Sequence, residues 1–122
     1  MKYFKLALCG VVIAMCSFLP QVQAADLAAG KAVWEKLNCA SCHGADAKSP
    51  IMPVYPILAG QHADFLAHAL KAYQRGATGA PASANVRKNA VMGAFATQLS
   101  NQDIKNVSVW LAAQPGPLVV RK

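Results

Sequence analysis

The feature that most constrains this sequence is a run of five residues, Cys39-Ala40-Ser41-Cys42-His43. Two thiols separated by two residues and followed at once by an imidazole form the pattern by which a c-type haem is attached. Cysteines at i and i+3 share one helical turn, so their sulfur atoms can reach two neighbouring vinyl groups of a porphyrin. His43 then meets the iron from one side of the ring. The chain contains the pattern once, which predicts one covalently bound haem c.

Three other interpretations of the two thiols remain open on the motif alone. A thioredoxin-like redox pair expects a βαβ pattern around it, and none is visible. A zinc site needs four ligands, which would have to be drawn from Cys39 and Cys42 together with His43, His62 and His68. A simple disulfide is the third. Haem attachment is favoured because signs of export, a helical pattern and a methionine candidate for the iron agree with it.

The first 24 residues have the layout of a secretory signal peptide. A short basic start precedes a nearly unbroken apolar run over residues 6–19, Pro20 breaks that run, and small residues precede a cleavage point after Ala24. The apolar run is shorter than the roughly 20 residues that span a bilayer. We therefore expect the segment 1–24 to be cleaved, with no stable membrane anchor afterwards.

Cleavage would leave residues 25–122 as a single domain and would remove Cys9 and Cys16. An exported chain whose remaining cysteines are Cys39 and Cys42 fits the bacterial periplasm, where haem can be attached outside the cytosol. The chain has 12 basic and 5 acidic residues, and loss of the two lysines in the signal would leave a net charge of +5. This charge suits solubility or steering toward an acidic partner. Nucleic acid is not an expected partner, because the positive charges are scattered.

The hydrophobic pattern predicts an all-α domain of three to five helices. The first helix is expected from Asp26, as its N-cap, to Leu37, and leads directly into the haem motif. A central helix is expected over residues 62–75, where apolar positions follow a 3.6-residue period, with Gly76 as its stop. The Pro-rich segment 44–60 and the small-residue segment 77–90 are expected to be loops.

Two further helices are expected near the C-terminus. A short helix is predicted over residues 93–98, and a longer one begins at Ser100, which resembles the N-cap of a capping box with Asp103. Pro115 ends that last helix. A domain of this size has a modest core, and a haem ring would supply a large apolar surface for the helices to cover.

His43 is the expected proximal iron ligand, through its Nε2 atom. Its Nδ1–H then needs an acceptor that fixes the orientation of the ring and raises its basicity. A backbone carbonyl in the Pro-rich loop after the motif can accept this hydrogen bond, and we expect it to be that of Pro56.

The second axial ligand must come from far enough along the chain to reach the other face of the ring. Met52 is only nine residues after His43 and suits an apolar contact at the haem edge better. His62 and His68 are six residues apart, point to different faces of the central helix and are expected to face solvent. Met92 is favoured, because it lies beyond the 77–90 loop and a thioether opposite an imidazole raises the haem potential.

Four segments, taken in order, resemble class I c-type cytochromes. They are Cys39-Ala40-Ser41-Cys42-His43-Gly44, Pro56-Ile57-Leu58-Ala59-Gly60-Gln61, Arg87-Lys88-Asn89-Ala90-Val91-Met92 and Leu99-Ser100-Asn101-Gln102-Asp103-Ile104. The second segment looks most like small periplasmic monohaem cytochromes and the haem domains of bacterial dihaem cytochromes c. The resemblance implies the cytochrome c fold, with Pro56 beside the proximal histidine and Met92 as the distal ligand. It also implies a contact of the first and last helices at Gly30, Trp34 and Trp110.

The chain departs from that family pattern in two places. The segment 77–84 is longer than the usual link, and Trp110 replaces the more frequent tyrosine. Neither departure touches the expected ligands, although the longer loop could reshape a partner surface.

These features predict a periplasmic electron carrier that exchanges single electrons with other redox proteins, and not an enzyme. An alternative is a haem c subunit held permanently in a dehydrogenase or oxidase complex. Another is a five-coordinate haem protein that binds gases or reacts with peroxide, in which Met92 is not a ligand.

Overall fold

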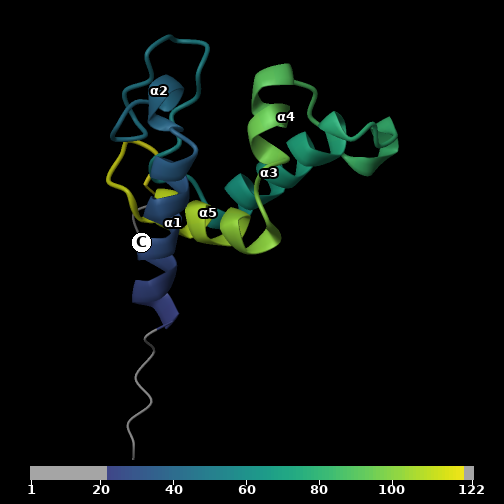
Figure 1. Ribbon diagram of the computed structural model, residues 1–122. Coiled ribbons are helices and arrows are strands. Elements are labelled where there is room, and N and C mark those ends of the chain that lie inside the picture. The colour runs from purple at the N-terminus through teal and green to yellow at the C-terminus, as the bar shows by residue number, and fades with distance from the viewer. Residues whose placement is uncertain (1–21, 120–122) are drawn as a thin grey trace, which may run out of the picture.

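The computed structural model describes residues 22–119, with side chains from residue 27 onward (Figure 1). In that range the chain is helical and contains no strand, as the all-α expectation requires. The elements are α1 (Val22–Lys36), α2 (Ala40–His43), α3 (Ala63–Ala77), a short 3-10 helix η1 (Ala82–Ala84), α4 (Ala90–Ala96) and α5 (Asn101–Ala113). The expected signal segment lies almost wholly outside the described residues.

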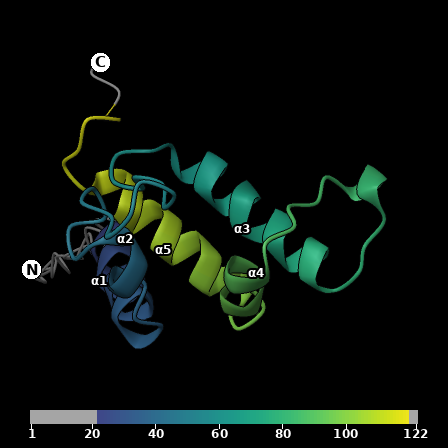
Figure 2. The ribbon, with the colours of Figure 1, turned by 90° about the horizontal axis from the view of Figure 1, so that it is seen from above.

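Helix α5 lies between two groups of elements. It packs against α1 on one side and against α3 on the other, and α4 packs against α3 (Figure 2). Helix α2 and the loop after it lie beside α1, away from α4 (Figure 1). The motif and Met92 are therefore carried by two different parts of the fold.

The α1–α5 contact is close because Gly30 has no side chain. A Cβ atom there would overlap the carbonyl oxygen of Asn106 and Cβ of Trp110. One turn later Trp34 is buried, and its ring centroid lies 5.4 Å from that of Trp110. The expected contact of glycine and two tryptophans is present, and it brings the two helices together beside the motif.

The apolar core continues from this contact into the loop and α3. Burying a large aliphatic or aromatic side chain contributes about 1.5–3 kcal/mol, so a few such residues dominate the stability of a domain this small. The buried cluster consists of Val33, Trp34, Ala47, Ala59, Leu66, Val107 and Leu111.

The segment between α2 and α3 is a loop, as expected, and hydrogen bonds hold it in place. The Asp46 carboxylate accepts hydrogen bonds from the backbone N–H groups of Lys48, at 2.9 Å, and Ser49, at 2.8 Å. These bonds hold the pKa of Asp46 below its usual value. Further along, the N–H of Gly60 donates to the carbonyl of Leu111 at 3.0 Å, which ties the end of the loop to α5.

The structure corrects the expected role of Gly76. Helix α3 does not stop there but continues to Ala77, with Thr78 as its C-cap. A Cβ atom at Gly76 would overlap the carbonyl oxygen of Arg87, so the glycine permits close approach of the returning chain. His62, expected as the first helical residue, lies at the N-cap position.

Other helix boundaries also differ from expectation. Helix α1 begins at Val22, so Asp26 lies within it and is not its N-cap. Helix α4 begins at Ala90, three residues earlier than expected, because the Asn89 side chain caps it. The capping box of Ser100 and Asp103 at the start of α5 is confirmed. Among the described residues, no helix is both long enough and apolar enough to cross a membrane.

Candidate functional site

The two cysteines of the motif lie on one turn beside α1. The chain leaves α1 through Asn38, whose φ of 49° lies in the left-handed region that asparagine tolerates better than most residues. Cys39 is the N-cap residue of α2, and its carbonyl accepts a hydrogen bond from the His43 N–H at 3.1 Å. The thiols of Cys39 and Cys42 are free and half-buried. The disulfide interpretation is therefore wrong for this structure.

His43 is held on several sides. Its side chain is 6% exposed, and its Nδ1 atom donates a hydrogen bond to the Pro56 carbonyl oxygen at 3.1 Å. The imidazole centroid lies 6.3 Å from the Trp34 ring and 6.0 Å from the Tyr55 ring. The hydrogen bond to Pro56 fixes the tautomer and leaves Nε2 as the nitrogen with a free lone pair.

The pKa values of Cys39 and of Tyr55 are both raised by their surroundings. Burial raises the pKa of the Cys39 thiol. The charge that Cys42 carries as a thiolate raises the pKa of the Tyr55 hydroxyl beside it. The motif thus provides two half-buried cysteines, with an aromatic hydroxyl next to Cys42.

Met92 lies in the first turn of α4, away from the motif along the chain. Its backbone N–H donates to the Asn89 side-chain oxygen at 2.9 Å, and its side chain is half-buried. Helix α4 packs against α3, so Met92 and His43 are positioned by different helices. Of the other candidates, His62 and His68 are exposed, as expected, and Met52 is exposed in the loop after the motif.

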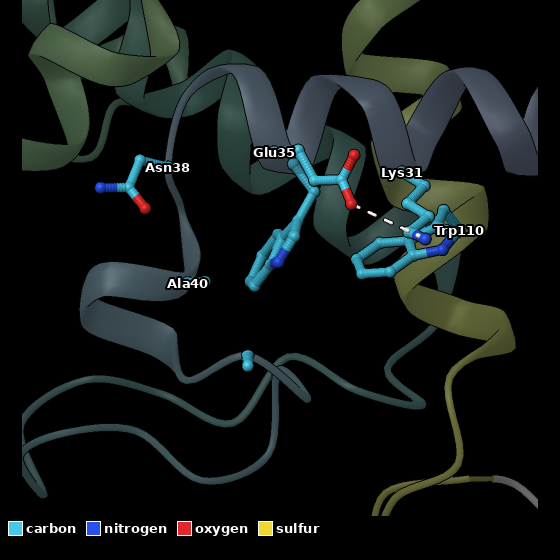
Figure 3. A pocket seen from close by; sticks show the side chains of 7 residues that line it. Lys31, Glu35, Asn38, Ala40 and Trp110 are labelled. Atoms are coloured by element: carbon cyan, nitrogen blue, oxygen red, sulfur yellow. Dashed lines mark ion pairs between the residues drawn. The ribbon is translucent and has the colours of Figure 1, made fainter.

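Two surface hollows lie on the described part of the chain, and the first is lined in part by Trp34 and by Ala40 of the motif. One, of about 300 Å³, lies beside α1 and α5, and Figure 3 shows Trp110 and the Lys31–Glu35 ion pair, at 3.6 Å, along it. The other, of about 440 Å³, lies between α3 and α5 and is lined by residues that include Asp64 and Ser108. Neither hollow is lined by the motif cysteines, His43 or Met92.

The residues around the motif fit a covalently attached haem. Two free thiols on one turn could form the thioethers, and a buried imidazole with an uncommitted Nε2 could donate a nitrogen to the iron. Large apolar side chains are exposed in the loop after the motif, at Ile51 and Val54, and on the helices of the other part of the fold, at Phe65 on α3 and Val91 on α4. Such side chains suit a cofactor with a broad apolar face.

Three contributions were not anticipated from the sequence. Tyr55 contacts His43, and its place directly before Pro56 is a signal that could have identified it. The Asn89 cap on α4 could have been recognised from the sequence, because asparagine is a favoured N-cap residue and Asn89 lies three positions before Met92. Gln74 donates to the carbonyls of Ala96 and Leu99, both at 2.8 Å, and no local pattern indicates that contact.

Comparison with known proteins agrees with this assignment. Residues 27–114 match the family model for cytochrome c. The chain is 35% identical over 95 residues to cytochrome c-554(548) of Halomonas halodenitrificans, covering 75% of this chain and 99% of that protein. It is 33% identical over 103 residues to cytochrome c-553 of Nitratidesulfovibrio vulgaris, covering 84% and 93%.

A longer relative is also similar. The thiosulfate dehydrogenase electron acceptor of Stutzerimonas stutzeri is 33% identical over 121 residues, which cover 96% of this chain. The chain spans only about half of that relative, 51% of its length, but nearly all of the two single-domain relatives above. The motif, the helical fold and these matches together show that the chain belongs to the cytochrome c family, as an electron-transfer protein with one covalently bound haem c.

Proposed function

We propose that this cytochrome is an exported, periplasmic monohaem protein that carries single electrons between redox partners, with His43 and Met92 as axial ligands. The observation that carries the proposal is the environment of His43. A buried imidazole whose Nδ1 is committed to the Pro56 carbonyl presents Nε2 as a metal ligand. Iron held in a haem between an imidazole and a thioether exchanges one electron at a raised potential.

The protein's part in this function is to hold the two ligands and to exclude water. Trp34 and Tyr55 pack around the imidazole of His43, so the ring has little freedom to rotate. Met92 lies in the first turn of α4, and the Asn89 cap fixes that turn. Two firmly held ligands keep the coordination the same in both oxidation states, so that little has to rearrange when an electron moves.

The partner surface is proposed to lie at the edge near Cys39 and Cys42. Both cysteines are half-buried, so this edge is close to the surface of the protein. Lys36 and Lys48 are exposed nearby in sequence and could orient the edge toward an acidic surface. Encounters between redox proteins are usually small and weak, which suits a carrier that must be released after each transfer.

Export is part of the same proposal. The composition of residues 1–24 supports cleavage after Ala24, and covalent haem attachment is suited to an oxidising compartment. Mass spectrometry of the purified holoprotein tests this directly. A mass equal to residues 25–122 plus one haem is expected, and a mass that includes the first 24 residues would contradict cleavage.

A second candidate is a permanent haem subunit of a dehydrogenase complex. The observation that favours it is the similarity to a protein named as the electron acceptor of thiosulfate dehydrogenase. The exposed residues of the 77–90 segment or the chain after Pro115 would then form the docking element. Elution as a free monomer after native purification is expected for the carrier, whereas co-elution with a catalytic subunit would support the complex.

The test of the ligand assignment is the optical spectrum of the oxidised protein. Wild type should show the weak far-red band of iron–methionine ligation, and Met92→Ala should lose it. Met52→Ala is the matched control, because Met52 is 46% exposed and should leave the band unchanged. A band that is absent from wild type or survives Met92→Ala would exclude Met92, as would ready binding of carbon monoxide by the reduced wild type at neutral pH.

A further inference from the structure

The segment that carries Met92 is attached to α3 upstream of the methionine. The Arg87 N–H donates to the Ala72 carbonyl at 3.0 Å, and the Arg87 carbonyl lies against Gly76. The Arg87 guanidinium lies 5.4 Å from the Phe65 ring centroid and 5.7 Å from that of Tyr73, within cation–π range of both. Both the backbone and the side chain of Arg87 therefore hold this part of the chain on α3.

The rest of the long connection is fixed by the same helix. Arg75 donates to the Asn85 carbonyl through Nη2, at 2.8 Å, and through Nε, at 3.3 Å. Asn85 has a φ of 51°, in the left-handed region, and it ends η1. The extra length of the segment is thus folded back onto the C-terminal half of α3.

The chain is attached to α3 again after Met92. Gly93 is buried against Ala77, where an added Cβ atom would come within 3.1 Å of the Ala77 Cβ. The Gln74 side chain donates to the carbonyls of Ala96 and Leu99, both at 2.8 Å. The Ala96 carbonyl belongs to the last residue of α4 and also accepts from the Leu99 N–H at 3.1 Å, and the Leu99 carbonyl lies in the connection to α5.

We propose that the C-terminal half of α3 sets the position of Met92, and that Gln74 and Arg87 are positioning residues for this ligand. The inference rests on the proposed function, because it takes Met92 to be the distal ligand. Arg87 fixes the chain five residues before Met92, and Gln74 fixes it from four residues after. Neither residue has to touch the iron, because each acts by limiting how far α4 can move from α3.

The measurement is the affinity of the oxidised protein for added imidazole, which binds iron only when Met92 is displaced. Its apparent affinity is proportional to the population in which the methionine is released. Gln74→Met keeps the length of the side chain but removes both hydrogen bonds, so the affinity should rise about tenfold. Arg87→Gln removes the stacked cation, and the affinity should rise about fivefold.

Each variant has a matched control. Gln98→Met removes a hydrogen bond to the Ala94 carbonyl at the same helix end, but that bond lies within the local chain and does not reach α3. Lys88→Gln removes an exposed positive charge next to Arg87. Both controls should bind imidazole like wild type. If Gln74→Met does not accumulate as holoprotein, Gln74→Glu tests the same contact, because an ionised carboxylate cannot donate to a carbonyl.

The outcomes separate this inference from the proposed function. A wild type without the far-red band overturns both, since Met92 would then not be the ligand. A wild type with the band, but with Gln74 and Arg87 variants that match their controls, overturns only the positioning role. The effect on imidazole binding must also appear at denaturant concentrations where far-ultraviolet circular dichroism shows the variant fully folded. An effect confined to the unfolding transition would indicate a general structural role and would contradict the inference.

Discussion

The two sides of the proposed haem site are built in different ways. On the proximal side, His43 lies four residues after Cys39, is buried, and is surrounded by Trp34, Tyr55 and the Pro56 carbonyl. On the proposed distal side, Met92 is half-buried on α4. Residues close to Met92 in the sequence contact α3, and these contacts determine where Met92 lies. One proposed ligand is held by its own contacts, and the other is held by the position of its helix.

This difference has a consequence for stability and ligand exchange. Trp34, which packs on His43, is part of the core formed by α1, α5, the loop and α3, so a change there alters the stability of the whole domain. The α4 segment is joined to that core through α3, so a change there should release the methionine before the domain unfolds.

Trp34→Ala should have the largest effect. Trp34 is 4% exposed and lies between His43 and Trp110, so truncation leaves a cavity in the core. We expect the free energy of unfolding to fall by about 4 kcal/mol. Denaturant unfolding followed by circular dichroism measures this, with Trp34→Phe as the conservative control. If Met92→Ala destabilised the fold more than Trp34→Ala, the assignment of the core to the proximal side would be wrong.

Gly30→Ala should have the next largest effect. The added methyl group would overlap the Asn106 carbonyl oxygen, and the two helices would have to separate. Overpacking of this kind typically costs 1–3 kcal/mol, and we expect about 2 kcal/mol in the free energy of unfolding. Ala28→Val, at an exposed position on the same helix, is the control and should cost much less. Equal effects of the two substitutions would argue against close helix contact at Gly30.

The smallest effects concern the two helix caps, which provide a direct comparison of the two sides. Asn89 caps α4 beside Met92, whereas Ser100 caps α5, which belongs to the core. Removing either cap with alanine should cost about 1 kcal/mol. Asn89→Ala should act mainly on imidazole affinity, and Ser100→Ala mainly on global unfolding. If Asn89→Ala acted mainly on global unfolding and Ser100→Ala mainly on imidazole affinity, the assignment of α5, and not α4, to the core would be wrong.

The Ser100 cap should also depend on pH. The Ser100 hydroxyl, and then its backbone N–H, donate to Asp103 and lower the pKa of that carboxyl. A pKa that is lowered in the folded state contributes stability. This contribution is complete above the pKa of the unfolded state, about 3.9, and is lost as the pH falls through the pKa of the folded state. The difference in unfolding free energy between wild type and Ser100→Ala should therefore be full at pH 6 and should narrow below about pH 4. A difference that grows on acidification would contradict the capping box.

Sequence reasoning was most successful where the relevant contacts are local. The Ser100 capping box and the turn that carries Cys39 and Cys42 each involve residues three apart, so their spacing alone predicts their geometry. The hydrogen bond from His43 to Pro56 spans 13 residues but follows from the need to fix a ligand imidazole, and it was confirmed. The assignment of His43 and Met92 as the ligands themselves stays a prediction.

Sequence reasoning was least successful along the connection from α3 to α4. Gly76 was expected to end a helix, because glycine often does so, yet it serves a close approach of Arg87, 11 residues later. The earlier start of α4 depends on the Asn89 cap, and the contact of Gln74 with Ala96 and Leu99 spans more than 20 residues. Contacts of this range depend on how the chain turns back, which helical periodicity does not encode.

The sequence by itself determined the cofactor, the family and the helical character of the domain. A haem attachment motif works through side chains on one helical turn, so its chemistry is present in the order of the residues. Only the tertiary structure decided how α4, which carries Met92, is held in place. The residues that locate Met92, above all Gln74 and Arg87, are brought to it by the packing of α4 on α3, because each acts across a contact between segments far apart in the chain.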